Sequence, residues 1–223
     1  MKGEYLILNI IILIGPLSLS FDRKVHYFRY WSKVLISLGI VMIPFLLWDV
    51  AVSGIHWHFN KNFTLPVRFY GLPLGEILFF VSVPFACLFI WQIIVTNKQN
   101  ILANNKLLLY VIVLCGCCAF VLFMLWGKMY TSIVCFAIAF TIFFDRLMKT
   151  HVLSQKRTYL YLAILTVLIA IFNGYLTARP IVLYNSTYFT NIRIWTIPIE
   201  DFGYGYTLIL LCTIIFEKLK GSF

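Results

Sequence analysis

Carboxylates follow a proline in two related motifs, and they are the side chains in this sequence best suited to chemistry. One motif reads Leu72-Pro-Leu-Gly-Glu76, and the other reads Ile197-Pro-Ile-Glu-Asp201. Two or three carboxyls gathered in an apolar site would repel one another if all were ionised, so at least one should hold a proton near neutral pH. A protonated carboxyl beside an ionised one is the pair that an isomerisation by proton addition and removal requires. We therefore predict Glu76, Glu200 and Asp201 as catalytic residues.

The residues around the two motifs also repeat. Proline suits the first turn of a helix and the helix dipole favours carboxylates just after it, so helix capping is an alternative explanation of the acids. Capping does not explain why an arginine lies five residues before each proline and an asparagine eight residues before each arginine. We expect these residues to keep a carboxylate charged or to contribute to the substrate site: Arg68, Arg193, Asn60 and Asn185.

Asp49 and several aromatic residues complete the predicted site. Asp49 lies late in an apolar segment, where an ionisable group is costly and is therefore a candidate partner of the carboxylate motifs. Aromatic ring faces near the acids could stabilise a developing carbocation, although aromatic belts at membrane interfaces explain the same composition. The candidates for cation stabilisation are Phe79, Phe80, Trp195, Phe202, Tyr204 and Tyr206.

Several kinds of chemistry lack their usual signals. The four histidines show no metal-ligand spacing on a helix, and the six cysteines lie in apolar segments, where thiols act as small apolar residues. The sequence has no glycine-rich nucleotide fingerprint, no Gly-x-Ser-x-Gly elbow and no aspartate-rich motif for magnesium diphosphate. We expect no cofactor, no metal site and an uncharged substrate dissolved in lipid.

The elements that carry these residues are predicted to be transmembrane helices. Hydrophobic residues make up 62% of the 223 residues and charged residues 12%, with a mean hydropathy of +0.93. Backbone groups inside a bilayer must pair within the segment, and these apolar segments are too long for barrel strands. We predict an all-α membrane protein with about seven spans: Tyr5–Leu19, Val34–Val52, Ile77–Val95, Leu107–Trp126, Met129–Phe144, Tyr159–Leu176 and Phe202–Phe216.

The distribution of basic residues predicts the orientation in the membrane. The net charge is +10, but the lysines and arginines are dispersed between the apolar segments, so we expect no nucleic-acid binding. Twelve of the eighteen would be cytoplasmic if the N-terminus lies outside. We therefore predict a multi-pass protein of the cell membrane, with membrane lipid as a partner, the N-terminus outside and the C-terminus in the cytoplasm.

An internal repeat organises the chain. An offset of 125 positions pairs Phe59-Asn60 with Tyr184-Asn185 and Cys87 with Cys212, in addition to the arginines and acids named above. Spans one to three then match spans five to seven, which makes the repeats parallel and leaves the fourth span as a connector. We predict a first repeat at 1–100, a connector helix at 101–127 and a second repeat at 128–223.

The two carboxylate motifs and the residues around them resemble those of the lycopene cyclase domain family, over about residues 3–219. The second half is similar to the second subunit of the heterodimeric bacterial enzymes, here fused to the first half in one chain. The motifs that carry the resemblance are Gly15-Pro16-Leu17, Phe45-Leu-Leu-Trp48-Asp49, Leu72-Pro-Leu-Gly-Glu76, Asn173-Gly174 and Arg193-Ile-Trp-Thr-Ile-Pro198-Ile-Glu200-Asp201.

The resemblance implies a lycopene β-cyclase, an isomerase that needs no net redox change. By this analogy an acid protonates the terminal double bond of lycopene, the C5–C6 double bond attacks the C1 cation, and a base removes the C6 proton. One β-ionone ring forms at each end, through γ-carotene to β-carotene. The expected ligand is lycopene or a related linear carotenoid, and a homo-oligomer or an association with other carotenoid enzymes stays open.

One departure from the family pattern leaves alternatives open. Gly75 stands where the family usually has the first of two adjacent acids. Either Glu76 suffices together with Glu200 and Asp201, or the first motif is only structural. The product could also be an ε-ring, or the substrate could be another carotenoid with an acyclic ψ-end. A non-catalytic carotenoid-binding membrane subunit is the alternative from another functional class.

Overall fold

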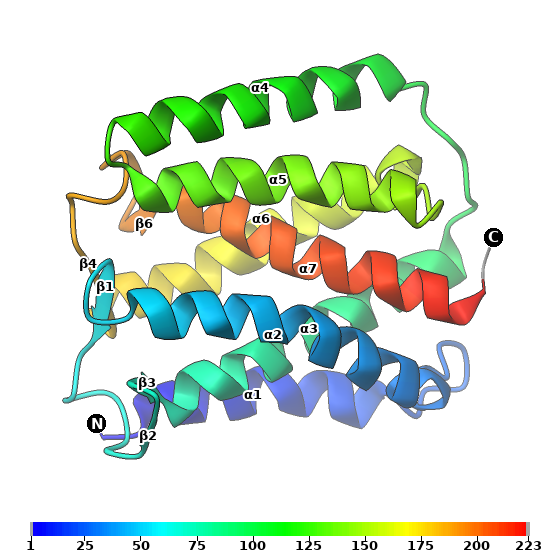
Figure 1. Ribbon diagram of the computed structural model, residues 1–223. Helices are drawn as coiled ribbons and strands as arrows, with labels where there is room; N and C mark the ends of the chain where they lie inside the picture. The colour runs from blue at the N-terminus through cyan, green and yellow to red at the C-terminus, as the bar shows by residue number, and fades with distance from the viewer. Residues whose placement is uncertain (1, 222–223) are drawn as a thin grey trace.

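A computed structural model of the chain, which describes residues 2–221, is a bundle of helices that lie side by side in alternating directions (Figure 1). The part of the chain described contains seven α-helices. They are α1 (Glu4–Leu19), α2 (Trp31–Val52), α3 (Leu74–Asn97), α4 (Lys106–Leu125), α5 (Met129–Leu147), α6 (Lys156–Ala178) and α7 (Ile199–Lys220). Short 3₁₀ helices, η1 (Tyr27–Tyr30) and η2 (Val152–Ser154), precede α2 and α6.

Six of these helices, all but α1, are long and apolar enough to cross a membrane, which indicates a multi-pass membrane protein. Five of them, all but α5, begin one to three residues earlier than the predicted spans. α3 begins at Leu74 and α7 at Ile199, so the motif acids Glu76 and Asp201 lie in the first helical turn. Pro73 and Pro198 immediately precede these helices, where proline's missing N–H leaves no intrahelical bond unmade.

Short strands at one end of the bundle, where the N-terminus also lies, connect the helices (Figure 1). The sequence prediction of a purely helical chain missed them. The strands pair backbone N–H and C=O groups in the connection between α2 and α3 and in the connection between α6 and α7. These groups would otherwise need other hydrogen-bond partners. The strands are β1 (Trp57–Phe59), β2 (Arg68–Phe69), β3 (Leu72–Pro73), β4 (Val182–Tyr184), β5 (Arg193–Ile194) and β6 (Ile197–Pro198).

The strand pairs occur twice in similar form. β2 pairs with β3 before α3, and β5 pairs with β6 before α7, with Arg68 opposite Pro73 and Arg193 opposite Pro198. β1 and β4 pair antiparallel with each other, and His58 opposite Leu183 is the middle pair. The β1–β4 pairing therefore links the segment before α3 to the segment before α7.

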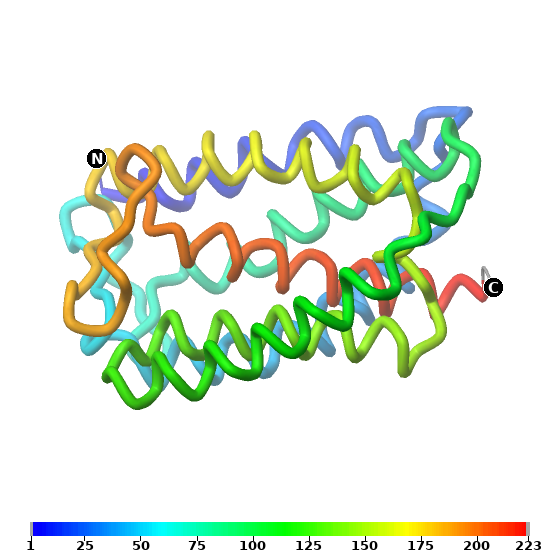
Figure 2. Tube along the Cα trace, turned by 90° about the horizontal axis from the view of Figure 1, so that it is seen from above, coloured from blue at the N-terminus to red at the C-terminus, as the bar shows by residue number. Residues whose placement is uncertain are grey.

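Helix α7 is the central element of the bundle. It packs against α2, α3, α5 and α6 (Figure 2), and 67% of its most apolar 18-residue stretch is buried. α4 packs mainly against α5, and only 6% of its corresponding 18-residue stretch is buried. An apolar helix that is exposed on most of its surface fits a lipid environment. The bundle thus surrounds α7 and leaves α4 at the periphery.

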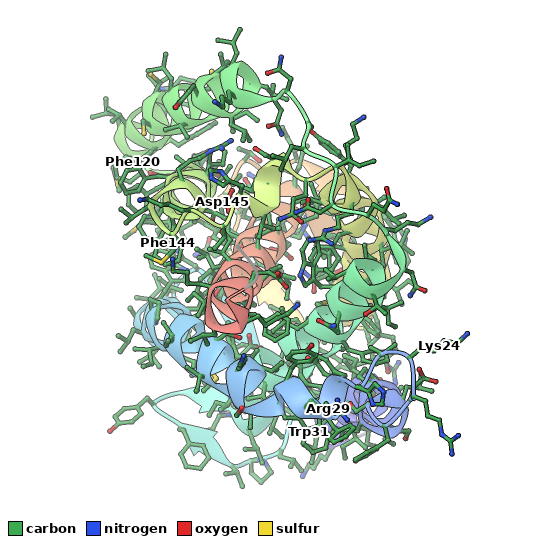
Figure 3. All side chains as sticks on the ribbon, turned by 90° about the vertical axis from the view of Figure 1, so that its right-hand side faces the viewer. Lys24, Arg29, Trp31, Phe120, Phe144 and Asp145 are labelled. Atoms are coloured by element: carbon green, nitrogen blue, oxygen red, sulfur yellow. The ribbon has the colours of Figure 1, made fainter. Side chains whose placement is uncertain are left out.

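The end of the bundle opposite the strands carries capped loops and basic residues. Asp145 accepts hydrogen bonds from Thr150 Oγ1 at 2.5 Å and from the Val152 N–H at 2.9 Å, so it fixes the turn that leads into η2. Asp22 accepts the Lys24 N–H at 2.8 Å in the corresponding loop before η1. Lys24, Arg29 and Asp145 all lie at this end (Figure 3). The two Asp-Arg motifs therefore have a structural role in this fold.

Candidate active site

Three carboxyl groups from three helices meet at the strand end of the bundle. Asp49 comes from the last turn of α2, Glu76 from the first turn of α3, and Asp201 from the first turn of α7. Their residues are 1%, 8% and 3% exposed, respectively. All three line one cavity of about 60 Å³, which is large enough for a few water molecules or a small end of a ligand. The predicted acids Glu76, Asp201 and Asp49 are thus brought together.

Tyrosine hydroxyls bind the two motif acids in equivalent ways. Tyr5 donates to Glu76 Oε2 at 2.5 Å, and Tyr130 donates to Asp201 Oδ1 at 2.8 Å. Both pairs are separated by 71 residues, and both tyrosines lie in the first turn of their helix. Tyr184 of β4 donates a second hydrogen bond to Asp201, to Oδ2, at 2.7 Å. Asp201 therefore accepts one tyrosine hydroxyl on each oxygen.

Asp49 joins the first acid to the second repeat. Tyr204 of α7 donates to Asp49 Oδ1 at 2.9 Å, and Asp49 and Glu76 line the same cavity. An ionised carboxylate can only accept a hydrogen bond, so two carboxyls bind each other only when one of them is protonated. Asp49 and Glu76 are therefore placed to share one proton.

An apolar cavity of about 200 Å³ leads away from the carboxyls between α1, α3, α6 and α7. It shares Phe79, Asn173, Asp201 and Tyr204 with the carboxyl cavity, so the two cavities meet at the acids. Along α3 its wall extends from Phe79 to Ile90, which corresponds to about 16 Å of helix. A long hydrocarbon can lie in this cavity with one end against the carboxyls.

Gly75, the departure from the family pattern, has a clear steric role. A Cβ atom at this position would lie 2.8 Å from Cγ and Cδ1 of Tyr5. The Gly75 carbonyl also accepts the Asn9 Nδ2 hydrogen bond at 2.9 Å. The missing side chain therefore lets α1 approach α3 closely enough for Tyr5 to reach Glu76.

We expect Gly75→Ala to displace the Tyr5 ring and to weaken the hydrogen bond between Tyr5 and Glu76. Overpacking of this kind costs about 1–3 kcal/mol of folding free energy. Thermal unfolding of the detergent-purified protein and the rate of ring formation per unit of protein would measure the two effects. Gly39→Ala is the matched control, because no atom lies within 4 Å of the added Cβ there. Equal behaviour of the two variants would contradict the steric role.

Glu200 is not brought into the carboxyl cavity. Its Oε1 accepts hydrogen bonds from Thr131 Oγ1 at 2.6 Å, from the Thr190 N–H at 2.8 Å and from Thr190 Oγ1 at 2.7 Å. The side chain is buried and joins α5 to the loop before β5. Glu200 thus holds the loop over the second repeat, while its neighbour Asp201 faces the cavity.

The predicted arginines and asparagines support the connections and do not contact the carboxyls within hydrogen-bonding distance in the described residues. Arg68 donates to Thr64 Oγ1 at 2.8 Å, and Arg193 donates to the Thr196 carbonyl at 2.6 Å. The Arg193 guanidinium also lies over the rings of Tyr184 and Phe189, with centroid distances of 5.8 and 5.1 Å. Arg193 therefore acts on the site through Tyr184.

Asn60 and Asn185 form equivalent turns. Asn60 Oδ1 accepts the Asn62 N–H at 3.0 Å, and Asn185 Oδ1 accepts the Thr187 N–H at 3.1 Å. Side chains that bind the backbone two residues later are typical of Asx turns. In this structure the paired asparagines shape the connections after β1 and β4.

The predicted aromatic residues divide into two groups. Phe79 and Tyr204 line both the carboxyl cavity and the apolar cavity. Phe80 and Phe202 are buried away from these cavities, and Trp195 is 73% exposed in a turn with a positive φ of 58°. Tyr206 lines a different cavity. Of the six candidates, Phe79 and Tyr204 are therefore the two placed to face a cation near the acids.

The tyrosines that bind Glu76 and Asp201 were not predicted from the sequence. Tyr5, Tyr130 and Tyr184 come from three separate elements, and Trp57, Phe59 and Asn173 also line the carboxyl cavity. The repeat contained a usable signal, because Tyr5 and Tyr130 are related by the same offset of 125 positions as Glu76 and Asp201. Within the described residues, no group of three or more His, Cys, Asp or Glu side chains is arranged to hold a metal ion.

Tyr184 lies outside the membrane-crossing helices, and burial followed by the nearby Asp201 raises its pKa well above the ordinary value of 10. A raised pKa means that the hydroxyl keeps its proton, and its hydrogen bond to Asp201, as the pH rises through 10. We expect Tyr184→Phe to lower the cyclisation rate about 10- to 100-fold, as for loss of a hydrogen bond to a charged group. We also expect the loss to be the same across pH 7–10, because the hydroxyl does not titrate there.

A rate profile of the wild type and Tyr184→Phe in detergent would test this prediction. Phe59 occupies the position equivalent to Tyr184 in the first repeat, so phenylalanine is compatible with this local fold. Wild-type activity that falls to the level of the variant between pH 7 and pH 10 would contradict the assigned protonation.

The long apolar helices enclose buried carboxyls at one end of an apolar cavity. This fold and site define a class of protein: a multi-pass membrane protein whose carboxyl site faces an apolar cavity. A family model described as lycopene cyclase matches residues 4–94 and 127–219, which together form most of the chain. The chain belongs to the lycopene cyclase family and carries both halves of the domain in one polypeptide. The matched stretches contain α1–α3 and α5–α7 and leave α4 outside. No curated protein and no solved structure matches the chain significantly.

Proposed function

We propose that this protein is a lycopene β-cyclase that closes both ends of lycopene by acid–base catalysis without a cofactor. Family membership supports a carotenoid cyclase. The observation that carries the proposal is the meeting of Asp49, Glu76 and Asp201 at the head of an apolar cavity of about 200 Å³. A carotenoid end has no polar group to bind, so the cavity supplies the affinity and the carboxyls supply the proton chemistry.

The proton-sharing pair Asp49 and Glu76 is the proposed acid. It adds a proton to C2 of the terminal C1=C2 bond, which leaves a cation at C1. The electrons of the C5=C6 bond then form the C1–C6 bond, and the positive charge moves to C5. Phe79 and Tyr204 line the cavity beside this position, where their ring faces stabilise the cation.

Asp201 is the proposed base. The hydroxyls of Tyr130 and Tyr184 donate to its two oxygens, and hydrogen bonds to a carboxylate favour its ionised form. Removal of the C6 proton restores a C5=C6 double bond and gives a β-ring. One proton enters and one leaves per ring, so the product is an isomer of the substrate.

Pigment chromatography tests the reaction. Lycopene-producing bacteria that express this chain alone should accumulate β-carotene, with γ-carotene as the intermediate. A membrane preparation in heavy water should place deuterium at C2 of the ring. An ε-ring product would move the base to C4, and unchanged lycopene at normal protein abundance would favour a non-catalytic carotenoid-binding subunit.

We infer that α1 crosses the membrane together with the six longer helices, so that the chain has seven spans in two parallel repeats. α1 has 16 residues and a proline near its end, which is short for a full span. Seven alternating helices place the two termini at opposite ends of the bundle, as Figure 1 shows. With the basic loops in the cytoplasm, the N-terminus and the carboxyl site lie toward the outside.

A reporter pair tests this orientation in the cell membrane. We expect a C-terminal alkaline phosphatase fusion to be inactive and a C-terminal fluorescent-protein fusion to be bright, because the C-terminus lies in the cytoplasm. The opposite activities would overturn the seven-span orientation. Fusions after Gly127, on the opposite side of α4, serve as the matched control and should give the reverse pattern.

A further inference from the structure

A second apolar cavity lies on the other side of α7. It has a volume of about 220 Å³ and is enclosed by α2, α5 and α7. The first apolar cavity, of about 200 Å³, lies toward α1 and α6. In Figure 2, α7 runs between the layer that contains α6 and α1 and the layer that contains α5. These two hydrocarbon-sized spaces therefore lie on opposite sides of the central helix. A third apolar cavity, of about 370 Å³, lies between α4, α5, α6 and α7 and does not share a residue with the carboxyl cavity.

The walls of the two cavities are related by the internal repeat. Pro44 and Trp48 line the second cavity, and the residues 125 positions later, Ile169 and Asn173, line the first. The correspondence continues on the other helices of the two walls at an offset of 125 positions. There Phe79 and Ala86 of the first cavity correspond to Tyr204 and Leu211 of the second.

Tyr204 is common to both apolar cavities and to the carboxyl cavity. Its ring packs edge-on against Phe45 at a centroid distance of 5.0 Å, and its hydroxyl donates to Asp49 at 2.9 Å. The second cavity is thus separated from Asp49 by one aromatic side chain. Trp48, which also lines the second cavity, has a buried indole N–H without a hydrogen-bond partner among the described residues.

We propose that the cavity between α2, α5 and α7 is a second binding site for an isoprenoid polyene chain, which approaches the shared carboxyls from the side opposite the first cavity. The proposal rests on the proposed function for the chemistry at the carboxyls, but the binding does not depend on catalysis. The repeated wall is the reason to assign the same class of ligand, since apolar cavities with corresponding lining residues favour the same kind of hydrocarbon.

A two-ended substrate gives this second site a use. The two ends of a long polyene cannot occupy one carboxyl cavity at the same time. With a cavity on each side of α7, a chain end can lie on either side of Tyr204, which separates the second cavity from Asp49. Tyr204 therefore donates a hydrogen bond to Asp49 and also separates the two proposed binding sites for a polyene chain.

The test uses bulky substitutions that fill one cavity at a time. Ala137→Trp fills the second cavity and Ala86→Trp fills the first, and the lipid-exposed Leu114→Trp on α4 is the matched control. Each variant is combined with Asp201→Asn, so that lycopene stays unreacted, and is purified in detergent from lycopene-producing bacteria. Lycopene bound per protein chain is then measured by absorbance.

We expect each filling substitution to lower the bound lycopene to about half of the control value and the double substitution to remove nearly all of it. Bound lycopene that is unchanged by Ala137→Trp, or fully lost with Ala86→Trp alone, would overturn the second site. Ala137→Phe replaces Ala137→Trp if the larger variant does not reach the membrane. The failure of ring formation in the wild type would count against the proposed function alone, because this measurement reports binding.

Discussion

Asp201→Asn is expected to lower β-carotene formation about 1,000-fold, which is within the 10²–10⁴-fold range for loss of a general acid or base. Asparagine has no charge to accept the C6 proton. Its amide NH₂ would also face a tyrosine hydroxyl that now donates to a carboxylate oxygen, since Tyr130 and Tyr184 occupy both oxygens of Asp201. The rate of ring formation per unit of membrane protein, measured by pigment chromatography, gives the effect.

The adjacent acid supplies the matched control for this prediction. Glu200→Gln keeps an oxygen that can accept from Thr131 and Thr190, and Glu200 does not line the carboxyl cavity. We expect this variant to retain cyclisation within about threefold, a change of less than 1 kcal/mol in the barrier. Equal losses in the two variants would show that the cavity does not distinguish the adjacent acids and would contradict the assignment of the base.

Asp49→Asn and Glu76→Gln are each expected to lower ring formation about 100- to 1,000-fold, because each removes one member of the proposed proton-sharing pair. The double variant should lose little more than either single variant. Residues that act as one unit show this kind of non-additivity, since the first substitution already removes the function of the pair. The measurement is the rate of first-ring formation in each single variant and in the double variant. The loss in the double variant is compared with the losses in the two single variants.

Asn173 supports this choice of substitution. It lines the same cavity as Asp49, so an asparagine side chain is compatible with the surroundings of this cavity. Membrane abundance of Asp49→Asn should therefore stay near that of the wild type. Losses that multiply in the double variant would show independent roles for Asp49 and Glu76 and would overturn the shared-proton assignment.

The second half of the carboxyl site illustrates why a motif alone could not assign its residues. Glu200 and Asp201 are adjacent and both carry a carboxyl group, but consecutive residues of an α-helix point about 100° apart. Only one of them can face a given cavity, and the packing of α7 against its neighbours sets the rotation of the helix. Asp201 faces Tyr130 and Tyr184, whereas Glu200 faces Thr131 and Thr190.

Composition, segment length and repeat spacing predicted the class of this protein and the position of its acids along the chain. Composition and length of the apolar segments are local properties that a lipid environment constrains strongly, so they predicted membrane helices. Proline followed by acids predicted helix starts, and α3 and α7 begin at these motifs. The offset of 125 positions relates Glu76 to Asp201 as equivalent residues of the two repeats, without any knowledge of their contacts.

The packing of the helices determines which side chains share the site. Tyr5 and Glu76, and likewise Tyr130 and Asp201, meet across 71 residues because helices pack side by side with particular rotations and separations. Gly75 permits one of these approaches by having no side chain. Helix rotation and interhelical distance depend on all neighbouring side chains together, and no local pattern in the sequence encodes them.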